Sequence, residues 1–280
     1  MRSWVRLACI VVVAMGAAVD VHAELALWEL GLGAGGASLP EYRGSDEQKS
    51  YLLPIPYMVY RGERFVMDRR GMRGLLFASE SVALDLSADF GVPVDSQRNR
   101  ARAGMPNLDF MLHLGPSLEF TLHEERDHGD VLKIKFPAQA VISMDMSEPG
   151  THGWFFFPHL NYIIRSRWTL GTAFGATFAT RDYHQYYYGV SASNATAKRP
   201  EYSAGAGYSS VRMSASLSRH VGDVWLGIFV RYENFANSVQ ADSPLVRSNY
   251  SLVTGFGATW IFLRSSRPAV DTPLSEPDTM

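Results

Sequence analysis

The stretch Leu108–Leu122, LDFMLHLGPSLEFTL, alternates between apolar residues and a mostly polar or small set. Its even-numbered positions read Leu, Phe, Leu, Leu, Pro, Leu, Phe and Leu, and its odd-numbered positions read Asp, Met, His, Gly, Ser, Glu and Thr. Side chains of a β-strand point to opposite faces in turn, whereas helical spacing would mix the two sets. The stretch therefore predicts a long strand with one apolar and one polar face.

The same period of two recurs along the chain. The other segments that show it are Val82–Phe90, Leu132–Ile142, Trp168–Phe178, Val224–Tyr232 and Tyr250–Phe262. Strands of a soluble sandwich usually have about five or six residues. Several of the segments here are long enough to cross a bilayer at a tilt, and aromatic residues gather near their ends, as in the girdles of membrane barrels. Between a soluble periplasmic β protein and a membrane barrel, the pattern favours an all-β, antiparallel transmembrane β-barrel.

The connections predict about twelve strands. Turns after even-numbered strands are short, and the longest of them spans Glu124–Asp130. Connections after odd-numbered strands are long, as in Gly91–Asn107 and Arg181–Pro200. Short periplasmic turns and long extracellular loops are typical of outer-membrane barrels, so both termini should be periplasmic. Ten strands is the alternative count, because Arg69-Arg70-Gly71 reads either as a hairpin or as a bulge.

The N-terminus has the pattern of a secretory signal. Arg2 and Arg6 precede an apolar run, and Val21-His22-Ala23 supplies small residues for cleavage. We expect residues 1–23 to be a cleaved signal peptide, 24–262 the barrel and 263–280 a polar C-terminal tail, which places the mature protein in the outer membrane of a Gram-negative type of cell.

Cys9, the only cysteine, lies in the signal, and the net charge of −2 does not suggest a nucleic-acid partner.

The segment Gly31–Gly36, GLGAGG, matches the G-x-G-x-x-G pattern of dinucleotide sites. Such a site needs a helix after the glycines and an acidic residue about 20 positions further on. Neither is present in the sequence here, so we predict no nucleotide and no cofactor. Gly31, Gly33 and Gly35 instead share one face of the first strand, where they let a neighbouring backbone approach closely.

The segment His123–His128, HEERDH, invites a metal interpretation, but its two histidines are five residues apart on a turn, not four apart on a helix. We interpret it as a solvated, charged periplasmic turn and predict no metal. No G-x-S-x-G nucleophile motif is present in the sequence. If the protein binds periplasmic partners, the side chains of this turn form the candidate surface: Glu124, Glu125, Arg126, Asp127 and His128.

A set of charged residues falls on the face predicted to line the lumen. Its members are Glu29, Asp85, Asp89, Asp109, Glu119, Lys133, Lys135, Arg231 and Glu233, with His113 and His159. Two interpretations remain open. The set could be catalytic, as in a hydrolase or lipid-modifying barrel, or its members could pair across the interior and fill it. The second is favoured because isolated charges away from water are costly.

Several blocks resemble the MipA/OmpV family of outer-membrane proteins. The N-terminal block is GLGAGGASLPEYRGSDEQKSYLLPIPYMVYRGERF, and the later blocks LDFMLHLGPSLEF, YYYGVSASNATAKRPEYSAGAG and ADSPLVRSNYSLVTGFGATWIF follow in the same order. The resemblance spans Leu30 to Phe262. One departure is that the chain continues beyond the aromatic residue that usually ends a barrel. Gly257, Trp260 and Phe262 still fit an internal signal for the barrel-assembly machinery.

The resemblance implies a non-enzymatic role. The family's named member is similar to a scaffold that brings a lytic murein transglycosylase together with a murein synthase, and other members are linked to adhesion or osmotic adaptation. We therefore expect a scaffold or interaction protein, surrounded by outer-membrane lipid. The alternatives are a narrow channel or an adhesin-like protein, and a hydrolase or lipid-modifying barrel.

Overall fold

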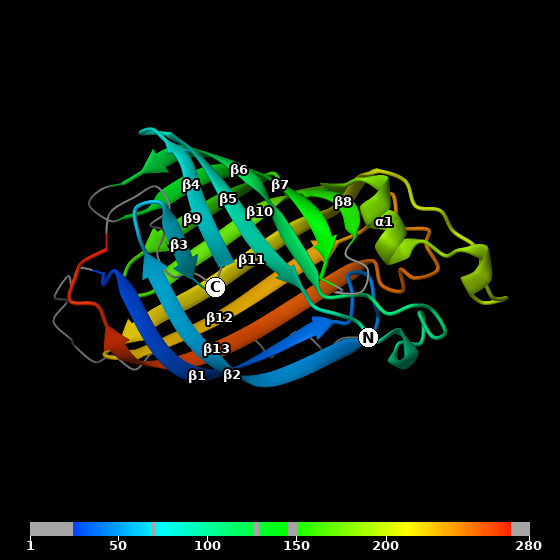
Figure 1. Ribbon diagram of the computed structural model, residues 1–280, viewed down its shortest axis with the longest axis horizontal. Coiled ribbons are helices and arrows are strands. Elements are labelled where there is room, and N and C mark those ends of the chain that lie inside the picture. Colours follow the sequence, from blue (N-terminus) through cyan, green and yellow to red (C-terminus); the bar gives the residue numbers. More distant parts are fainter. Residues whose placement is uncertain (1–24, 69–70, 126–128, 145–149, 270–280) are drawn as a thin grey trace, which may run out of the picture.

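The structure is a computed structural model that describes residues 25–68, 71–125, 129–144 and 150–269. It is a β-barrel with one α-helix at one end (Figure 1). The strands are β1 (Trp28–Pro40), β2 (Gln48–Arg61), β3 (Phe65–Asp68), β4 (Gly71–Ala78), β5 (Val82–Gly91), β6 (Met111–Glu124), β7 (Val131–Ser143), β8 (Thr151–Phe156), β9 (His159–Arg165), β10 (Thr169–Ala179), β11 (Gly207–Val221), β12 (Val224–Asn234) and β13 (Tyr250–Arg264). The helices are α1 (Arg181–Tyr188) and the short 3-10 turns η1 (Ser96–Arg98) and η2 (Ala192–Asn194).

All strand pairs are antiparallel, and pairing of β1 with β13 closes the sheet. β8 and β9 both pair with β7 and β10 and are separated by Phe157-Pro158, so they are two halves of one broken strand. Pro158 has no backbone N–H to donate to a sheet, which is consistent with the break at this point. Counted this way the barrel has twelve strands, which confirms the predicted fold and excludes the alternative of ten.

The strand predicted over Leu108–Leu122 starts three residues later, at Met111. Leu108 is buried above the barrel and forms an isolated bridge with Val94. The alternation predicted that Asp109 faces the lumen from a strand, and this prediction is wrong. Asp109 instead accepts a hydrogen bond from the hydroxyl of Tyr186 at 3.1 Å. The periodicity alone could not locate this start, because the residues before the strand continue the same alternation.

The two faces of the wall differ as the alternation predicts. Outward positions carry exposed apolar side chains, including Phe136, Phe174, Ile228, Phe256 and Trp260. Such a band is the lipid-facing surface of a membrane barrel. Inward positions carry buried polar or charged side chains, among them Asp85, Glu119, Lys133, Ser216 and Glu233.

Within the part of the chain that the structure describes, no helix is both long and apolar enough to cross a membrane.

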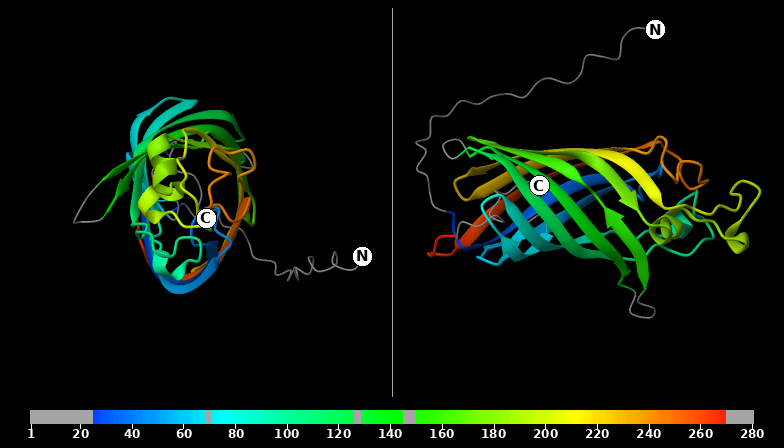
Figure 2. Two further views of the ribbon diagram at one scale, coloured as in Figure 1. Left: turned by 90° about the vertical axis from the view of Figure 1, so that its right-hand side faces the viewer. Right: turned by 90° about the horizontal axis from the view of Figure 1, so that it is seen from above.

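The two ends of the barrel differ in the length of their connections. One end carries the turns between β2 and β3, β4 and β5, β9 and β10, and β11 and β12, each of two or three residues, and the six-residue connection between β6 and β7. The described ends of the chain also lie there, joined by a bridge between Ala26 and Pro268. The other end carries the long loops and α1 (Figure 2). By the usual arrangement of outer-membrane barrels the short-turn end is periplasmic and the long-loop end extracellular.

Four loops interlock over the extracellular end and form what we call the cap (residues 41–47, 92–110, 180–206 and 235–249). Tyr42 donates its hydroxyl hydrogen bond to the carbonyl of Leu245 at 2.7 Å. Arg102 donates to the carbonyl of Tyr187 at 3.1 Å, and Arg199 donates to that of Ala101 at 2.9 Å. Seen down the barrel axis, these loops and α1 lie across the mouth (Figure 2). Sequence periodicity predicted these loops, but not the helix within the third.

Glycines line the closing seam. Gly31, Gly33 and Gly35 lie on the inner face of β1, as predicted, with β13 beside them. A Cβ atom at Gly33 would overlap the carbonyl oxygen of Ala258 and lie 2.7 Å from Cα of Thr259. The seam can therefore close at this register only because these positions lack side chains.

We expect Gly33→Ala to lower the barrel's stability by about 1–3 kcal/mol, the usual effect of overpacking. The variant should unfold at a lower temperature in heat-modifiability gels, where a folded barrel migrates differently from the boiled chain. Gly74→Ala in β4 is the matched control, because nothing lies within 4 Å of a Cβ built there. Equal melting of the two variants would contradict this account of the seam.

A buried histidine anchors α1. One ring nitrogen of His184 lies 2.8 Å from the carbonyl oxygen of Gly205, and the other lies 2.6 Å from the hydroxyl of Ser209. Burial lowers the pKa of His184 to about 4, with Arg43 acting in the same direction. The folded cap thus favours the neutral ring, so the unfolded cap binds more protons between pH 6.5 and pH 4.

We expect the cap to lose on the order of 1–3 kcal/mol of stability as the pH falls from 6.5 to 4, and to be fully stable above pH 6.5. Hydrogen exchange of residues 181–189, corrected for the intrinsic pH dependence, measures this loss. His184→Gln, which keeps polar groups but cannot titrate, should show a flatter profile. If the pH dependence of exchange in this variant equalled that of the native protein, a group other than His184 would be responsible for it.

Candidate functional site

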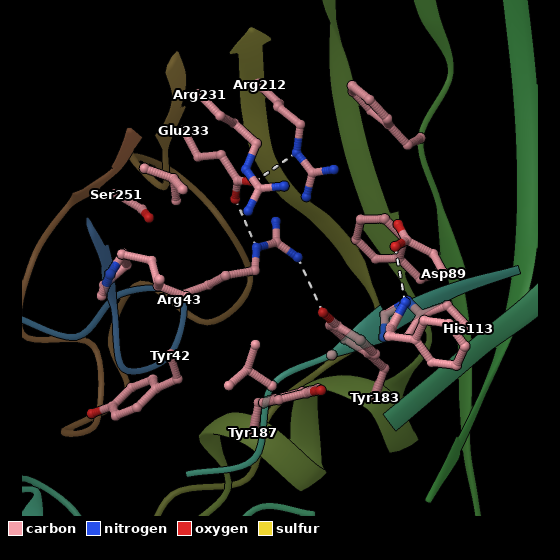
Figure 3. Close-up of a pocket in the computed structure, with 18 of the residues that line it drawn as sticks. Tyr42, Arg43, Asp89, His113, Tyr183, Tyr187, Arg212, Arg231, Glu233 and Ser251 are labelled. Atoms are coloured by element: carbon pink, nitrogen blue, oxygen red, sulfur yellow. Dashed lines mark hydrogen bonds and ion pairs between the residues drawn. The ribbon is translucent and has the colours of Figure 1, made fainter. Parts of the chain in front are cut away.

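The cap and the upper strand ends enclose a cavity of about 320 Å³ in the lumen. The cap contributes Tyr42 and Arg43 from residues 41–47 and tyrosines from α1, while the wall contributes side chains from β5, β6, β11 and β12 (Figure 3). Because the cap is on one side and the transmembrane wall on the other, the cavity lies in the extracellular half of the barrel.

Glu233 of β12 lies at the centre of a cationic cluster. Its Oε2 accepts a hydrogen bond from Nε of Arg43 at 2.7 Å. Its Oε1 lies 2.6 Å from Nε of Arg212 and 3.8 Å from Nε of Arg231. The carboxylate is almost completely buried, with 2 % of its side chain exposed. One negative group among three guanidinium groups leaves two positive charges in excess, so the cluster has an unbalanced positive charge.

Arg43 links the cap to the wall. Besides Glu233, it donates to the hydroxyls of Tyr183 at 3.1 Å, Thr177 at 3.2 Å and Ser210 at 3.1 Å. Burial by itself would lower the pKa of Arg43, but the Glu233 carboxylate outweighs it and raises that pKa above its ordinary value. All three guanidinium nitrogens of Arg43 therefore donate hydrogen bonds within the protein, and its role is structural.

Arg212 and Arg231 are held less completely. Each contacts Glu233 through Nε, and among the described residues their terminal nitrogens have no hydrogen-bond partner. Arg212 also stacks on aromatic rings, with its guanidinium carbon 4.6 Å from the ring centre of Phe157 and 5.4 Å from that of Phe155. The rings fix the plane of the guanidinium group, and the terminal nitrogens of both arginines remain available on a cavity that both residues line.

The opposite wall of the cavity carries His113 of β6 and Asp89 of β5, which face each other (Figure 3). Tyr183 projects from α1 toward them, and its ring centre lies 6.5 Å from that of His113. The lining carries three carboxylates, those of Glu41, Asp89 and Glu233, and three guanidinium groups, and the positive charge is concentrated around Glu233.

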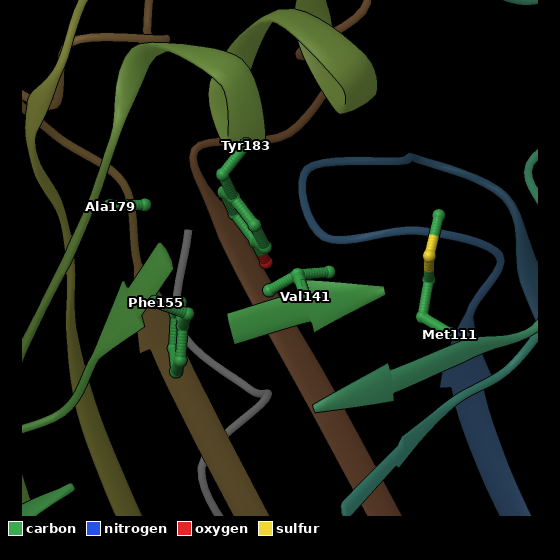
Figure 4. Close-up of a cluster of buried hydrophobic side chains, with 5 residues drawn as sticks. All are labelled: Met111, Val141, Phe155, Ala179 and Tyr183. Carbon is green, nitrogen blue, oxygen red and sulfur yellow. The ribbon is translucent and has the colours of Figure 1, made fainter. Parts of the chain in front are cut away.

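A hydrophobic cluster holds α1 in place above the cavity (Figure 4). Its buried members are Met111, Val141, Phe155, Ala179 and Tyr183, from four strands and α1. Tyr183 and Phe155 pack with ring centres 5.5 Å apart. The position of Tyr183 at the cavity follows from this packing.

Nearer the periplasm, ion pairs fill the lumen. Glu29 lies 3.1 Å from Arg61 and 3.4 Å from Arg264. Glu119 lies 2.8 Å from Lys135 and 3.5 Å from Lys133, and Arg73 lies 2.6 Å from Asp68. The predicted lumen-facing residues are thus mostly placed as expected, Asp109 excepted, and the contacts fit the interpretation that they fill the interior.

Five arginines of this network were not predicted from the sequence, namely Arg43, Arg61, Arg73, Arg212 and Arg264. Arg212 was within reach of the same reasoning, because β11 alternates polar Ser210, Arg212, Ser214 and Ser216 with apolar side chains. Arg43 had no such signal, since it lies in a loop and reaches Glu233, 190 residues away in sequence.

The proposed periplasmic surface is partly visible. Glu124 ends β6 and Glu125 follows it, and both are exposed at the short-turn end. Arg126, Asp127 and His128 lie outside the described residues. At the end of the chain, Trp260 and Phe262 face outward from β13, whereas Gly257 lies on the inner face and pairs with Gly35 and Gly227.

The described residues show little that suggests catalysis. His184 and Ser209 resemble a base and a nucleophile, but both are buried, and the second ring nitrogen of His184 faces a backbone carbonyl oxygen in place of a carboxylate. In the described part of the chain, no three His, Cys, Asp or Glu side chains are arranged to hold a metal ion.

Comparisons with known proteins place the chain. A comparison with curated proteins found no match. Among solved structures, a match described as a NanC porin is 9 % identical, covers 82 % of this chain and 98 % of its own, and superposes with a TM-score of 0.37. The family model described as "MltA-interacting protein MipA" matches residues 32–262. This match covers nearly the whole described barrel, and the chain belongs to the MipA family.

Proposed function

We propose that the protein is a scaffold in the outer membrane, which binds a lytic murein transglycosylase and a murein synthase at its periplasmic face. The observation that carries this proposal is membership of a family described as MltA-interacting. Murein enzymes work in the periplasm, so the contact must be made at the short-turn end of the barrel. The interior supports a binding role more than a transport role, since ion pairs fill the lower lumen and loops cross its mouth.

The connection between β6 and β7 is the proposed contact surface. It is the longest of the periplasmic connections, and Glu124 and Glu125 begin it with two exposed carboxylates. Its base is ordered by backbone hydrogen bonds, from Glu125 to Asp130 at 2.9 Å and from Gly129 to Glu125 at 2.7 Å. A charged connection on an ordered base suits recognition of a positively charged partner surface.

The route to the membrane is also a proposal. Residues 1–23 would be removed as a signal peptide, and the barrel would begin at Glu24. The aromatic end of β13, with Trp260 and Phe262 on its lipid face and Gly257 on its inner face, would be recognised by the barrel-assembly machinery. In support, β13 pairs with β1 and so completes the barrel. The described part of the tail, to Ala269, returns to the N-terminal segment, with the N–H of Ala269 donating to the carbonyl of Leu25 at 2.6 Å.

Pull-down of a purified lytic murein transglycosylase tests the scaffold. We expect the full-length protein to retain the enzyme, and the double variant Glu124→Lys/Glu125→Lys to retain at least about tenfold less, because two charge reversals oppose a cationic partner. Glu80→Lys, in the turn between β4 and β5, is the matched control at the same end of the barrel. Equal retention by both variants would place the surface elsewhere, and no retention by the native protein would contradict the scaffold.

Planar-bilayer recording separates the scaffold from the channel. We expect no steady current from the native protein, because the loops of the cap lie across the mouth of the barrel. Deleting residues 181–200 should raise the frequency of transient current steps through the barrel, because the deletion removes α1 and its tyrosines from above the cavity. A steady current through the native protein would favour the channel.

A further inference from the structure

Among the described residues, the strands between β2 and β5 are short and leave a gap in the hydrogen-bonded wall. β2 pairs with β1 along its whole length but with β3 only at Tyr60 and Arg61. Among the described residues, positions 48–59 of β2 have no strand partner on the side away from β1. β3 has four residues, and β4 pairs with β5 only as far as Ala88. Strands of the far wall are visible between β2 and β5 in Figure 1.

The sequence of β2 suits an unpaired edge. Pro54 and Pro56 lie opposite Ala34 and Leu32 of β1. Proline has no N–H, so neither pair can exchange hydrogen bonds, and the backbone at these two prolines faces away from β1. The absent donors therefore fall on the free edge, where they need no partner. Because open edges are not tolerated against lipid unless they line a cavity, we interpret the gap as a lateral opening.

The inner face of β2 beside this opening is apolar, unlike the rest of the lumen. The segment Tyr51–Tyr57, YLLPIPY, has no charged side chain on either face. Leu53 points inward, on the face of buried Tyr57, yet it is 57 % exposed, and Ile55 leans over Gly35. Apolar inward side chains that remain accessible are suited to contact a hydrocarbon chain.

The cavity below the cap is lined in part by the end of β5, the strand on the far side of this gap from β2. Phe90 points outward from the end of β5, where it is 52 % exposed and stacks on Phe110. It nevertheless lines the same cavity as Arg212, Arg231 and Glu233. The lining of the luminal cavity thus includes the upper end of β5, which borders the gap on the side opposite β2.

We infer that this cavity binds a single-chain anionic amphiphile, which enters laterally from the outer leaflet between β2 and β5. Its carboxylate or phosphate group accepts hydrogen bonds from the terminal nitrogens of Arg212 and Arg231 and offsets the excess positive charge around Glu233. Guanidinium groups bind both kinds of anion well, through paired N–H groups. The alkyl chain leaves the cavity along Leu53 and Ile55. This ligand site lies at the opposite end of the barrel from the proposed murein-enzyme surface.

Binding to the full-length protein in nanodiscs of zwitterionic phospholipid tests the head group. The probes are labelled dodecanoate and dodecyl phosphate, with binding to empty nanodiscs subtracted. We expect one saturable site for each probe, and about tenfold weaker binding to Arg212→Gln and to Arg231→Gln, since each variant loses a charge-assisted hydrogen bond. Neutral dodecyl maltoside should not compete. Each variant must first show native heat-modifiability, a control that does not involve the transglycosylase, so failure here is separate from failure of the scaffold.

A second pair of variants tests the lateral route. Leu53→Trp fills the opening from the inner face and should weaken dodecyl phosphate binding at least about tenfold, whereas Leu52→Trp, on the lipid face, should not. Inorganic phosphate should bind far more weakly than dodecyl phosphate. Equal affinity for inorganic phosphate, or equal effects of the two tryptophans, would overturn the lateral site in favour of an anion site reached from outside. Absence of any saturable anion binding would overturn the inference entirely.

Discussion

Closure of the sheet is the constraint on which the rest of this structure depends. A membrane offers no water to satisfy backbone groups, so a sheet can cross it only when its first and last strands pair. Here β1 and β13 meet that requirement along a seam where Gly31, Gly33 and Gly35 remove the side chains that would hold the strands apart. The glycines that resemble a nucleotide motif in sequence are therefore part of the device that closes the barrel.

Closure creates an interior that must be filled, and ion pairs fill it. Charged side chains are costly away from water unless they are paired, and the lumen pairs most of them in levels from Glu29 near the periplasm to Glu233 below the cap. Asp85 differs, because it is buried and its carboxylate oxygens have no hydrogen-bond partner among the described residues. At the upper level the pairing also has a long-range consequence. Glu233 holds Arg43, a loop residue, and so joins the cap to the wall. Around Glu233 itself positive charge is locally in excess, while the carboxylates of Asp89 and Glu41 line other parts of the same cavity.

Most of the architecture could be predicted from the sequence, because alternation of apolar and polar residues is dictated by the two environments of a barrel wall. The limits were equally physical. Alternation does not stop where a strand stops, as Leu108 and Asp109 show, and it says nothing about loops, so α1 and the reach of Arg43 were missed. The gap beside β2 was also missed, although the prolines of YLLPIPY and its apolar inner face mark it once the pairing is known.

Site-specific photo-cross-linking in intact cells tests the central claim, that this barrel acts by binding murein enzymes at its periplasmic end. A photoreactive residue at Glu125 should give an adduct with a lytic murein transglycosylase, and one at Asn194 in the extracellular cap should not. An adduct formed equally from both positions, or none from Glu125 or any other short turn, would contradict the claim.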